Sequence, residues 1–216
     1  MKSHTLPFAF EKTILNKIST RTTSTDLSFV GSVFLGKGSH NKRKEYLFEL
    51  IKAGFKDFYL SGSCDVFDEI ISKKMASLIK NVGLIGVWDA YQLKKVSKGS
   101  LFGLDMYNIF ANSKIVLNTH IDLVGNNAGN IRLFEATGVG SCLLTDYKEN
   151  ITDYFKVDEE IVVYRSKSEL IDKVNFLLKN EKIMQEIAIA GQRRTLENYN
   201  YNNRSKRLLE IINKYI

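Results

Sequence analysis

A polar, glycine-rich loop carries most of the side chains in this sequence that are equipped for chemistry. It begins at Asn118, the last residue of the apolar segment 114–118, and also contains His120, Asn126, Asn127 and Asn130. Amide side chains both donate and accept hydrogen bonds, so such a cluster suits a polar ligand. An imidazole also changes its charge near neutral pH and can serve as a general acid or base. His120 is therefore a candidate catalytic residue, although loop histidines more often form only local hydrogen bonds.

Arg132 and Glu135 follow this loop, in the first turn of a helix predicted over 131–137. They are three residues apart, so they share one face of the helix. An arginine is unfavourable at the positive end of a helix dipole, and a docked anion would explain its position. Glu135 is of the type that bonds ribose hydroxyls in nucleotide sites. The alternative is an Arg132–Glu135 ion pair worth a few tenths of a kcal/mol.

A second glycine-rich loop, 31–41, precedes a predicted helix over 41–53 whose first turn contains Lys42, Arg43 and Lys44. Glycines let the backbone approach a ligand closely, and free N–H groups at a helix N-terminus attract anions. The pattern is neither a P-loop nor a strict Gly-x-Gly-x-x-Gly. A flexible turn followed by solvated basic residues therefore remains the alternative.

Alternating strands and helices must position these loops. Strands are predicted over 27–35, 55–60, 82–88, 114–118, 142–145 and 160–164. Helices are predicted over 41–53, 66–80, 104–112, 131–137, 167–179, 182–198 and 202–215. This alternation predicts an α/β fold with a Rossmann-like parallel sheet and helices on both faces. Ligands bind beyond the carboxyl ends of such strands, which directs attention to loops 31–41, 118–130 and 145–150.

We expect three parts in the chain. Residues 1–26 are polar and form a lead-in or linker, and residues 27–198 form the Rossmann-like domain. Residues 199–216 form a C-terminal helix that packs back on the domain or towards a partner domain. Trp88 and Tyr91 are aromatic candidates for stacking on a base, but ordinary packing is the simpler explanation.

The composition limits the class of protein and of partner. The 216 residues are 44% hydrophobic and 25% charged, which excludes a collagen-like or disordered chain. The net charge of +7 resides at the chain ends, since residues 1–44 hold 8 basic and 2 acidic side chains and residues 193–216 hold 6 and 2. Such a charge suits nucleic acid, a membrane surface or a phosphate-bearing molecule. An apolar stripe at helical spacing explains the C-terminal arginines, so no nucleic acid is expected.

The two cysteines, Cys64 and Cys142, are far apart and show no metal-ligand spacing. We therefore expect no metal site and a reduced, cytoplasmic protein. Residues 1–14 lack the features of a signal peptide, and no apolar run approaches the roughly 20 residues that span a bilayer. The chain is expected to be soluble or peripherally associated with a membrane.

The segment 129–136, followed by Gly138 and the predicted strand 142–145, resembles the core signature of group 1 glycosyltransferases, and most closely their spore-maturation, CgeB-like branch. Further short segments resemble this family in the same order along the chain: 6–7, 28–32, 103–107, 113–118, 159–161, 169–170 and 187–191. Together these similarities cover nearly the whole sequence from residue 6 onward.

The resemblance implies a GT-B fold, in which two Rossmann-like domains flank a cleft and the C-terminal one binds a nucleoside-diphosphate sugar. It implies that Glu135 contacts ribose. It also implies a donor or phosphate site made of Gly31, Ser32, Arg43, Asn118, Asn130 and Arg132. The sugar donor would be a substrate, and neither a cofactor nor a metal is expected. Such side chains would neutralise the charge that develops on the leaving diphosphate.

Two departures from the family keep other functions open. Many members carry a second acidic residue seven positions before the ribose-binding one, where this chain has Ala128. The length corresponds to the C-terminal domain, so acceptor groups would come from a partner domain or chain. The first reading is a hexosyltransferase donor domain, of the kind that builds cell-surface polysaccharide. The alternatives are a non-catalytic nucleotide-sugar-binding subunit or remnant, and a nucleoside-diphosphate-sugar epimerase of the same fold.

Overall fold

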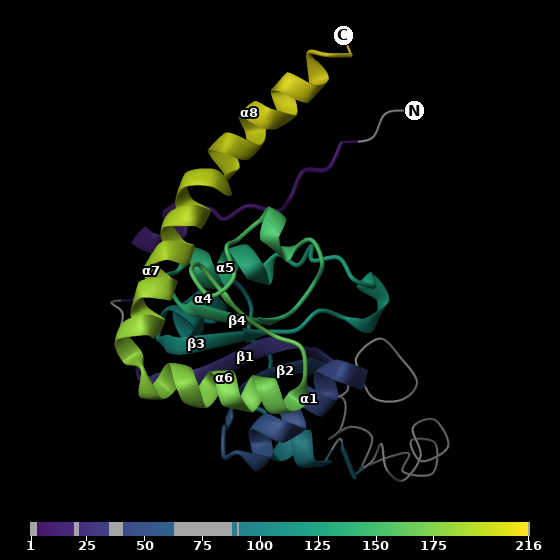
Figure 1. Cartoon of the computed structure of the whole chain (residues 1–216), viewed down its shortest axis with the longest axis vertical. Helices are drawn as coiled ribbons and strands as arrows, with labels where there is room; N and C mark the ends of the chain where they lie inside the picture. The colour runs from purple at the N-terminus through teal and green to yellow at the C-terminus, as the bar shows by residue number, and fades with distance from the viewer. Residues whose placement is uncertain (1–3, 20–21, 35–40, 63–87, 90, 216) are drawn as a thin grey trace.

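The computed structural model in Figure 1 describes residues 4–19, 22–34, 41–62, 88–89 and 91–215. The helix predicted over 66–80 and positions 82–87 of the strand predicted over 82–88 lie outside the described residues. The strand prediction is wrong at Trp88, which is helical, and residues 91–96 are helical although no helix was predicted there. The other predicted strands and helices are present, with slightly shifted ends.

Five parallel strands form one sheet in the order β2-β1-β3-β4-β5. Their bounds are β1 Thr25–Val33, β2 Asp57–Gly62, β3 Ser113–Asn118, β4 Cys142–Asp146 and β5 Val162–Tyr164. The register places Ser28 of β1 beside Val116 of β3, and Val116 beside Leu143 of β4. Because every neighbouring pair is parallel, all the carboxyl ends meet at one edge of the sheet.

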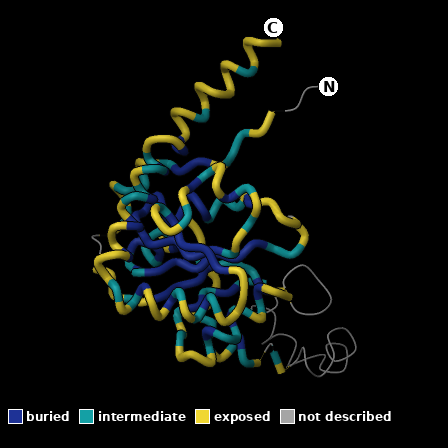
Figure 2. Tube along the Cα trace, in the orientation of Figure 1, coloured by how far each residue is buried: buried dark blue, intermediate teal, exposed yellow. Residues whose placement is uncertain are grey.

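Helices cover both faces of this sheet, which confirms the predicted fold class. The helices are α1 Asn41–Lys52, α4 Gly103–Ala111, α5 Arg132–Gly138, α6 Lys167–Lys179, α7 Glu181–Asn198 and α8 Tyr201–Ile212, with short 3₁₀ helices η1 Lys12–Asn16, η2 Asp122–Val124 and η3 Ile151–Asp153. Side chains alternate between two cores, as in β3, where Ile115 packs with α1 and α6 but Val116 packs with α4 and α5. Figure 2 shows the buried strands between these layers.

The N-terminal segment predicted as a lead-in contributes to one of the cores. Phe10 is 1% exposed, and its backbone N–H donates to the carbonyl oxygen of Tyr199 at 2.7 Å. Its ring lies directly against Gly138 of α5, where a Cβ atom would have no room. Packing on α5 therefore orders this part of the chain despite its polar composition.

Helix α8 has no buried residues and extends away from the sheet beside the N-terminal segment (Figures 1 and 2). The imidazole Nε2 of His4 and the hydroxyl of Tyr215 lie 2.8 Å apart, joining the two segments. Leu208, Leu209 and Ile212 leave an apolar stripe exposed on α8.

Within the described residues, no helix combines the length and apolarity that crossing a membrane requires.

Candidate functional site

The site is organised around neighbouring strands β1 and β3, whose following helices lie on opposite faces of the sheet. Helix α1 follows β1 on one face, and α5 follows β3 on the other. Ligands of open α/β sheets bind at such a reversal, beyond the carboxyl ends of the strands. The reversal brings Ser32, at the end of β1, near the loop that begins at Asn118.

The side chain of Arg43 links the ends of β1 and β3 by hydrogen bonds. Its guanidinium donates from Nη1 to the carbonyl oxygen of Ser32 at 2.8 Å and from Nη2 to that of Thr119 at 2.6 Å. The residue is only 6% exposed, and this burial lowers the pKa of the guanidinium. The family resemblance implied that Arg43 assists phosphate binding. Its guanidinium instead binds backbone oxygens, and its positive charge lies between the ends of β1 and β3.

The N-terminus of α1 is capped by a carboxylate from the loop that follows β3. Oδ2 of Asp122 accepts from the backbone N–H of Asn41 at 2.9 Å and from that of Lys42 at 3.5 Å. An acidic group is stabilised there by the helix dipole. The basic first turn of α1 suggested a bound anion at this helix end, and the protein's own Asp122 occupies it.

His120 is paired with Asp146, at the end of β4. The Oδ1 atom of Asp146 accepts from the backbone N–H of His120 at 2.9 Å and lies 2.7 Å from its ring Nδ1. The side chain of His120 is 2% exposed, and that of Asp146 is 14% exposed. This histidine is therefore fixed against the end of the sheet rather than free in a loop, and its partner Asp146 was missed by the sequence analysis.

Several charges act on Asp146. Burial alone would raise the pKa of its carboxyl, but the hydrogen bonds from His120, the charge of that ring when it is protonated and the charge of Lys148 lower it below the ordinary value. The Nζ atom of Lys148 lies 3.5 Å from Oδ2 of Asp146 and donates to the carbonyl oxygen of Gly125 at 2.7 Å. Lys148 thereby links this pair to the glycine-rich loop.

Asn118 and Asn130 are brought together as the sequence analysis expected for one ligand site. Nδ2 of Asn130 donates to Oδ1 of Asn118 at 2.9 Å, and Nδ2 of Asn118 donates to Oγ1 of Thr145 at 2.9 Å. Oδ1 of Asn130 accepts from the backbone N–H of Arg132 at 2.9 Å, which satisfies a free donor at the start of α5. These bonds hold the loop, and with it the beginning of α5, against strands β3 and β4.

Arg132 and Glu135 form the ion pair that was the alternative to a ligand contact. Nη1 of Arg132 donates to Oε2 of Glu135, while the hydroxyl of Tyr107 donates to Oε1 at 2.9 Å. Burial raises the pKa of the Tyr107 hydroxyl strongly, and the Glu135 charge raises it further. Glu135 is 5% exposed, so a ribose would have to share or displace one of these partners.

Two hollows adjoin the strand ends and meet at His120 and Ile121. The larger, about 450 Å³, is otherwise lined by residues 127–130 of the glycine-rich loop. The other, about 280 Å³, is lined by charged and aromatic side chains that include Lys42, Asp146 and Lys148. Neither lining includes Glu135 or Trp88.

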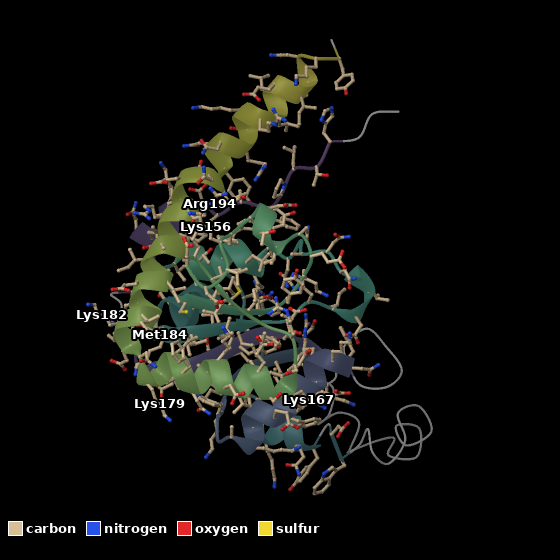
Figure 3. All side chains as sticks on the ribbon, in the orientation of Figure 1. Lys156, Lys167, Lys179, Lys182, Met184 and Arg194 are labelled. Carbon is tan, nitrogen blue, oxygen red and sulfur yellow. The ribbon has the colours of Figure 1, made fainter. Side chains whose placement is uncertain are left out.

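Other basic side chains lie elsewhere on the surface. Figure 3 labels Lys167 near one end of α6 and Lys179 and Lys182 at the α6–α7 junction. All three are exposed, and they are spread along these helices rather than gathered at the strand ends. In the described part of the chain, no group of three or more His, Cys, Asp or Glu side chains could hold a metal ion.

The fold is that of one half, the C-terminal domain, of a GT-B glycosyltransferase. Residues 43–210 match the family described as glycosyl transferase-like, and the chain belongs to that family. No curated protein sequence matches the chain.

Solved structures with this fold share little sequence with the chain. HepE from Anabaena, in complex with UDP, is 12% identical with a TM-score of 0.63, covering 95% of this chain and 56% of HepE. Sucrose-phosphate synthase from Thermosynechococcus elongatus is 11% identical with a TM-score of 0.60, covering 97% and 50%. The C-terminal domain of the group 1 glycosyl transferase LpcC from Francisella tularensis is 12% identical with a TM-score of 0.50, covering 90% and 96%. The chain thus spans about half the length of HepE and of the synthase.

Proposed function

We propose that this domain binds a nucleoside-diphosphate sugar and presents it for transfer of the sugar to an acceptor. The observation that carries the proposal is the position of the segment 129–136, which lies within the family match and begins beside the larger hollow at the carboxyl ends of β3 and β4. A polar ligand placed there meets backbone groups of the loop and side chains anchored by the sheet. This is the position at which α/β sheets bind nucleotides.

The proposed donor site combines the residues expected from the sequence. Glu135 accepts hydrogen bonds from ribose hydroxyls, while Arg132 turns part of its guanidinium towards the diphosphate. Arg132 is suited to this because its side chain is 25% exposed, whereas that of Glu135 is 7% exposed. Glycosyl transfer builds negative charge on the leaving diphosphate, and preorganised cations stabilise that charge. The remaining donor-site residues are Gly31, Ser32, Arg43, Asn118 and Asn130.

His120 is proposed as the side chain nearest the sugar, because it lies where the two hollows meet. Its role as an acid or base in the transfer is part of this proposal. HepE structures contain UDP and UDP-glucose, so uridine nucleotides and a hexose are the first ligands to test.

Acceptor groups are assigned to a second domain, on this polypeptide or another, that covers the exposed stripe of α8. Without that domain, this chain would bind the nucleotide sugar but would not transfer the sugar, and so would act as a binding subunit. We place the domain in the CgeB-like branch on the basis of the signature 129–136. A cytoplasmic location is supported by the buried free thiol of Cys142.

Calorimetric titration with UDP, GDP and ADP, each with and without an attached sugar, tests the proposal. We expect one nucleotide to bind and Arg132→Ala to weaken that binding about tenfold, as for loss of one charge-assisted hydrogen bond. Arg193→Ala, an exposed arginine on α7, is the matched control and should leave the affinity unchanged. If no nucleotide binds, the proposal is wrong, and binding without donor hydrolysis or transfer would favour the binding-subunit function.

A further inference from the structure

One ring nitrogen of His120 is not bonded by any residue in the described part of the chain. Its Nε2 atom is buried and has no hydrogen-bond partner among the residues that the structure describes. Buried polar atoms are nearly always hydrogen-bonded, so an exception beside a cavity indicates a place for a ligand or water. The residue lines both hollows at the carboxyl edge of the sheet.

Asp146 determines which nitrogen carries the proton. An ionised carboxylate only accepts hydrogen bonds, so the nitrogen 2.7 Å from Oδ1, Nδ1, must be the donor. The backbone N–H of His120 donates to the same oxygen at 2.9 Å and restricts the ring from a second direction. In the neutral ring, Nε2 is therefore left with a lone pair and can only accept a hydrogen bond.

The chemistry of Nε2 selects among the groups of a nucleotide sugar. An ionised phosphate oxygen has no hydrogen to donate to a neutral ring, whereas a sugar hydroxyl has one. The hollow beside His120 is about 450 Å³ and is lined mainly by residues 127–130, which include the start of the segment 129–136 proposed to hold the donor. Position 128 in that lining is alanine, so no carboxylate at this position competes for the hydroxyls.

We propose that Nε2 of His120 accepts a hydrogen bond from a hydroxyl group of the donor sugar, and that Asp146 is the positioning residue that makes this possible. The inference rests on the proposed function, since the ligand is the sugar of the same nucleotide sugar. His120 then distinguishes the sugar-bearing nucleotide from the free nucleotide.

The state of the ring is testable without any ligand. Nitrogen NMR of the three histidines at a pH where His120 is neutral should show it in the Nδ1–H form. Asp146→Ala should shift it towards the Nε2–H form, while Asp146→Asn, which keeps an acceptor oxygen, should restore the Nδ1–H form. Asp172→Ala, an exposed aspartate on α6, is the matched control. An Nε2–H ring in the unsubstituted protein would overturn the inference.

Binding supplies the second test. His120→Asn keeps a donor for Asp146 at the place of Nδ1 but removes the acceptor at Nε2. We expect it to weaken binding of the preferred sugar nucleotide, from a panel of UDP-glucose, UDP-galactose and UDP-N-acetylglucosamine, about tenfold, with UDP affinity unchanged. Asp146→Ala should act in the same direction, and Asp146→Asn should retain most of the affinity.

The outcomes separate the two proposals. If the unsubstituted protein binds none of UDP, GDP and ADP and none of their sugar nucleotides, the proposed function fails, and this inference fails with it. If it binds a sugar nucleotide and His120→Asn leaves the ratio of the two affinities unchanged, only this inference fails.

Discussion

The assignment of Glu135 to ribose can be tested sharply, because the structure shows what the carboxylate holds without ligand. Oε1 accepts from Tyr107 at 2.9 Å, and Oε2 is paired with Arg132. A bound ribose would add a hydroxyl to this buried carboxylate or replace Tyr107. Glu135→Ala removes the acceptor in both cases.

The expected effect follows from the type of bond. A hydrogen bond to a charged group contributes about 1.5–3 kcal/mol, and about 1.4 kcal/mol changes an affinity tenfold. Glu135→Ala should therefore weaken UDP binding by roughly tenfold to a hundredfold. It also leaves the half-buried Tyr107 hydroxyl without its acceptor, which should lower the free energy of unfolding by about 1–3 kcal/mol.

A ligand variant separates these two effects. The affinities of UDP and of its 2′,3′-dideoxy analogue, which lacks the ribose hydroxyls, are measured by calorimetry for each protein. The unsubstituted protein should prefer UDP by tenfold or more, and Glu135→Ala should abolish that preference. Glu186→Ala, an exposed glutamate on α7, should leave both the preference and the stability unchanged. If Glu135→Ala weakens both ligands equally, or neither, the reasoning is refuted.

Three further predictions concern the fold and its titrating groups. Because the pKa of Asp146 is lower in the folded protein than its ordinary value of 3.8, its contribution to stability is complete above about pH 5 and is lost as the pH falls through 3.8 and the folded pKa. Urea unfolding between about pH 5 and pH 3 should therefore show a smaller loss in Asp146→Asn than in the unsubstituted protein, and equal slopes would contradict this. Burial raises the pKa of the Cys142 thiol to about 12, so in a Cys64→Ser variant thiol reagents at neutral pH should label the protein only after unfolding. Labelling of the native protein would show that the thiol is accessible. Gly191→Ala should lower the free energy of unfolding by about 1–3 kcal/mol, because the new Cβ would collide with the carbonyl oxygen of Glu160. At an exposed helical glycine, the same change would instead raise the free energy of unfolding by about 1 kcal/mol. A higher melting temperature for Gly191→Ala would therefore contradict the predicted collision.

Local pattern predicted the five strands and helices α1 and α4–α8, but not the helical residues 91–96 or the short 3₁₀ helices. Segments such as 114–118 are short and apolar, and helices such as 167–179 repeat their apolar residues at helical spacing, so each choice is decided by neighbours in the chain. The alternation of the two element types then required a parallel sheet, because parallel strands need a helical crossover. Phe10 was not found in this way, since its burial depends on Gly138 and Tyr199, which are far along the sequence.

The sequence by itself determined the fold class and pointed to the loops in which the proposed site lies, through hydrophobic period and the position of polar residues after strands. It also brought out His120, Asn130 and Glu135 as residues able to bind a polar ligand. Only the tertiary structure decided their partners, because hydrogen bonds between strand ends join residues that no spacing relates. It paired His120 with Asp146, placed Asp122 on the N-terminus of α1 and directed Arg43 to backbone oxygens. Burial then raised the energetic importance of the bonds made by Arg43 and His120, since a buried polar group without a partner is costly.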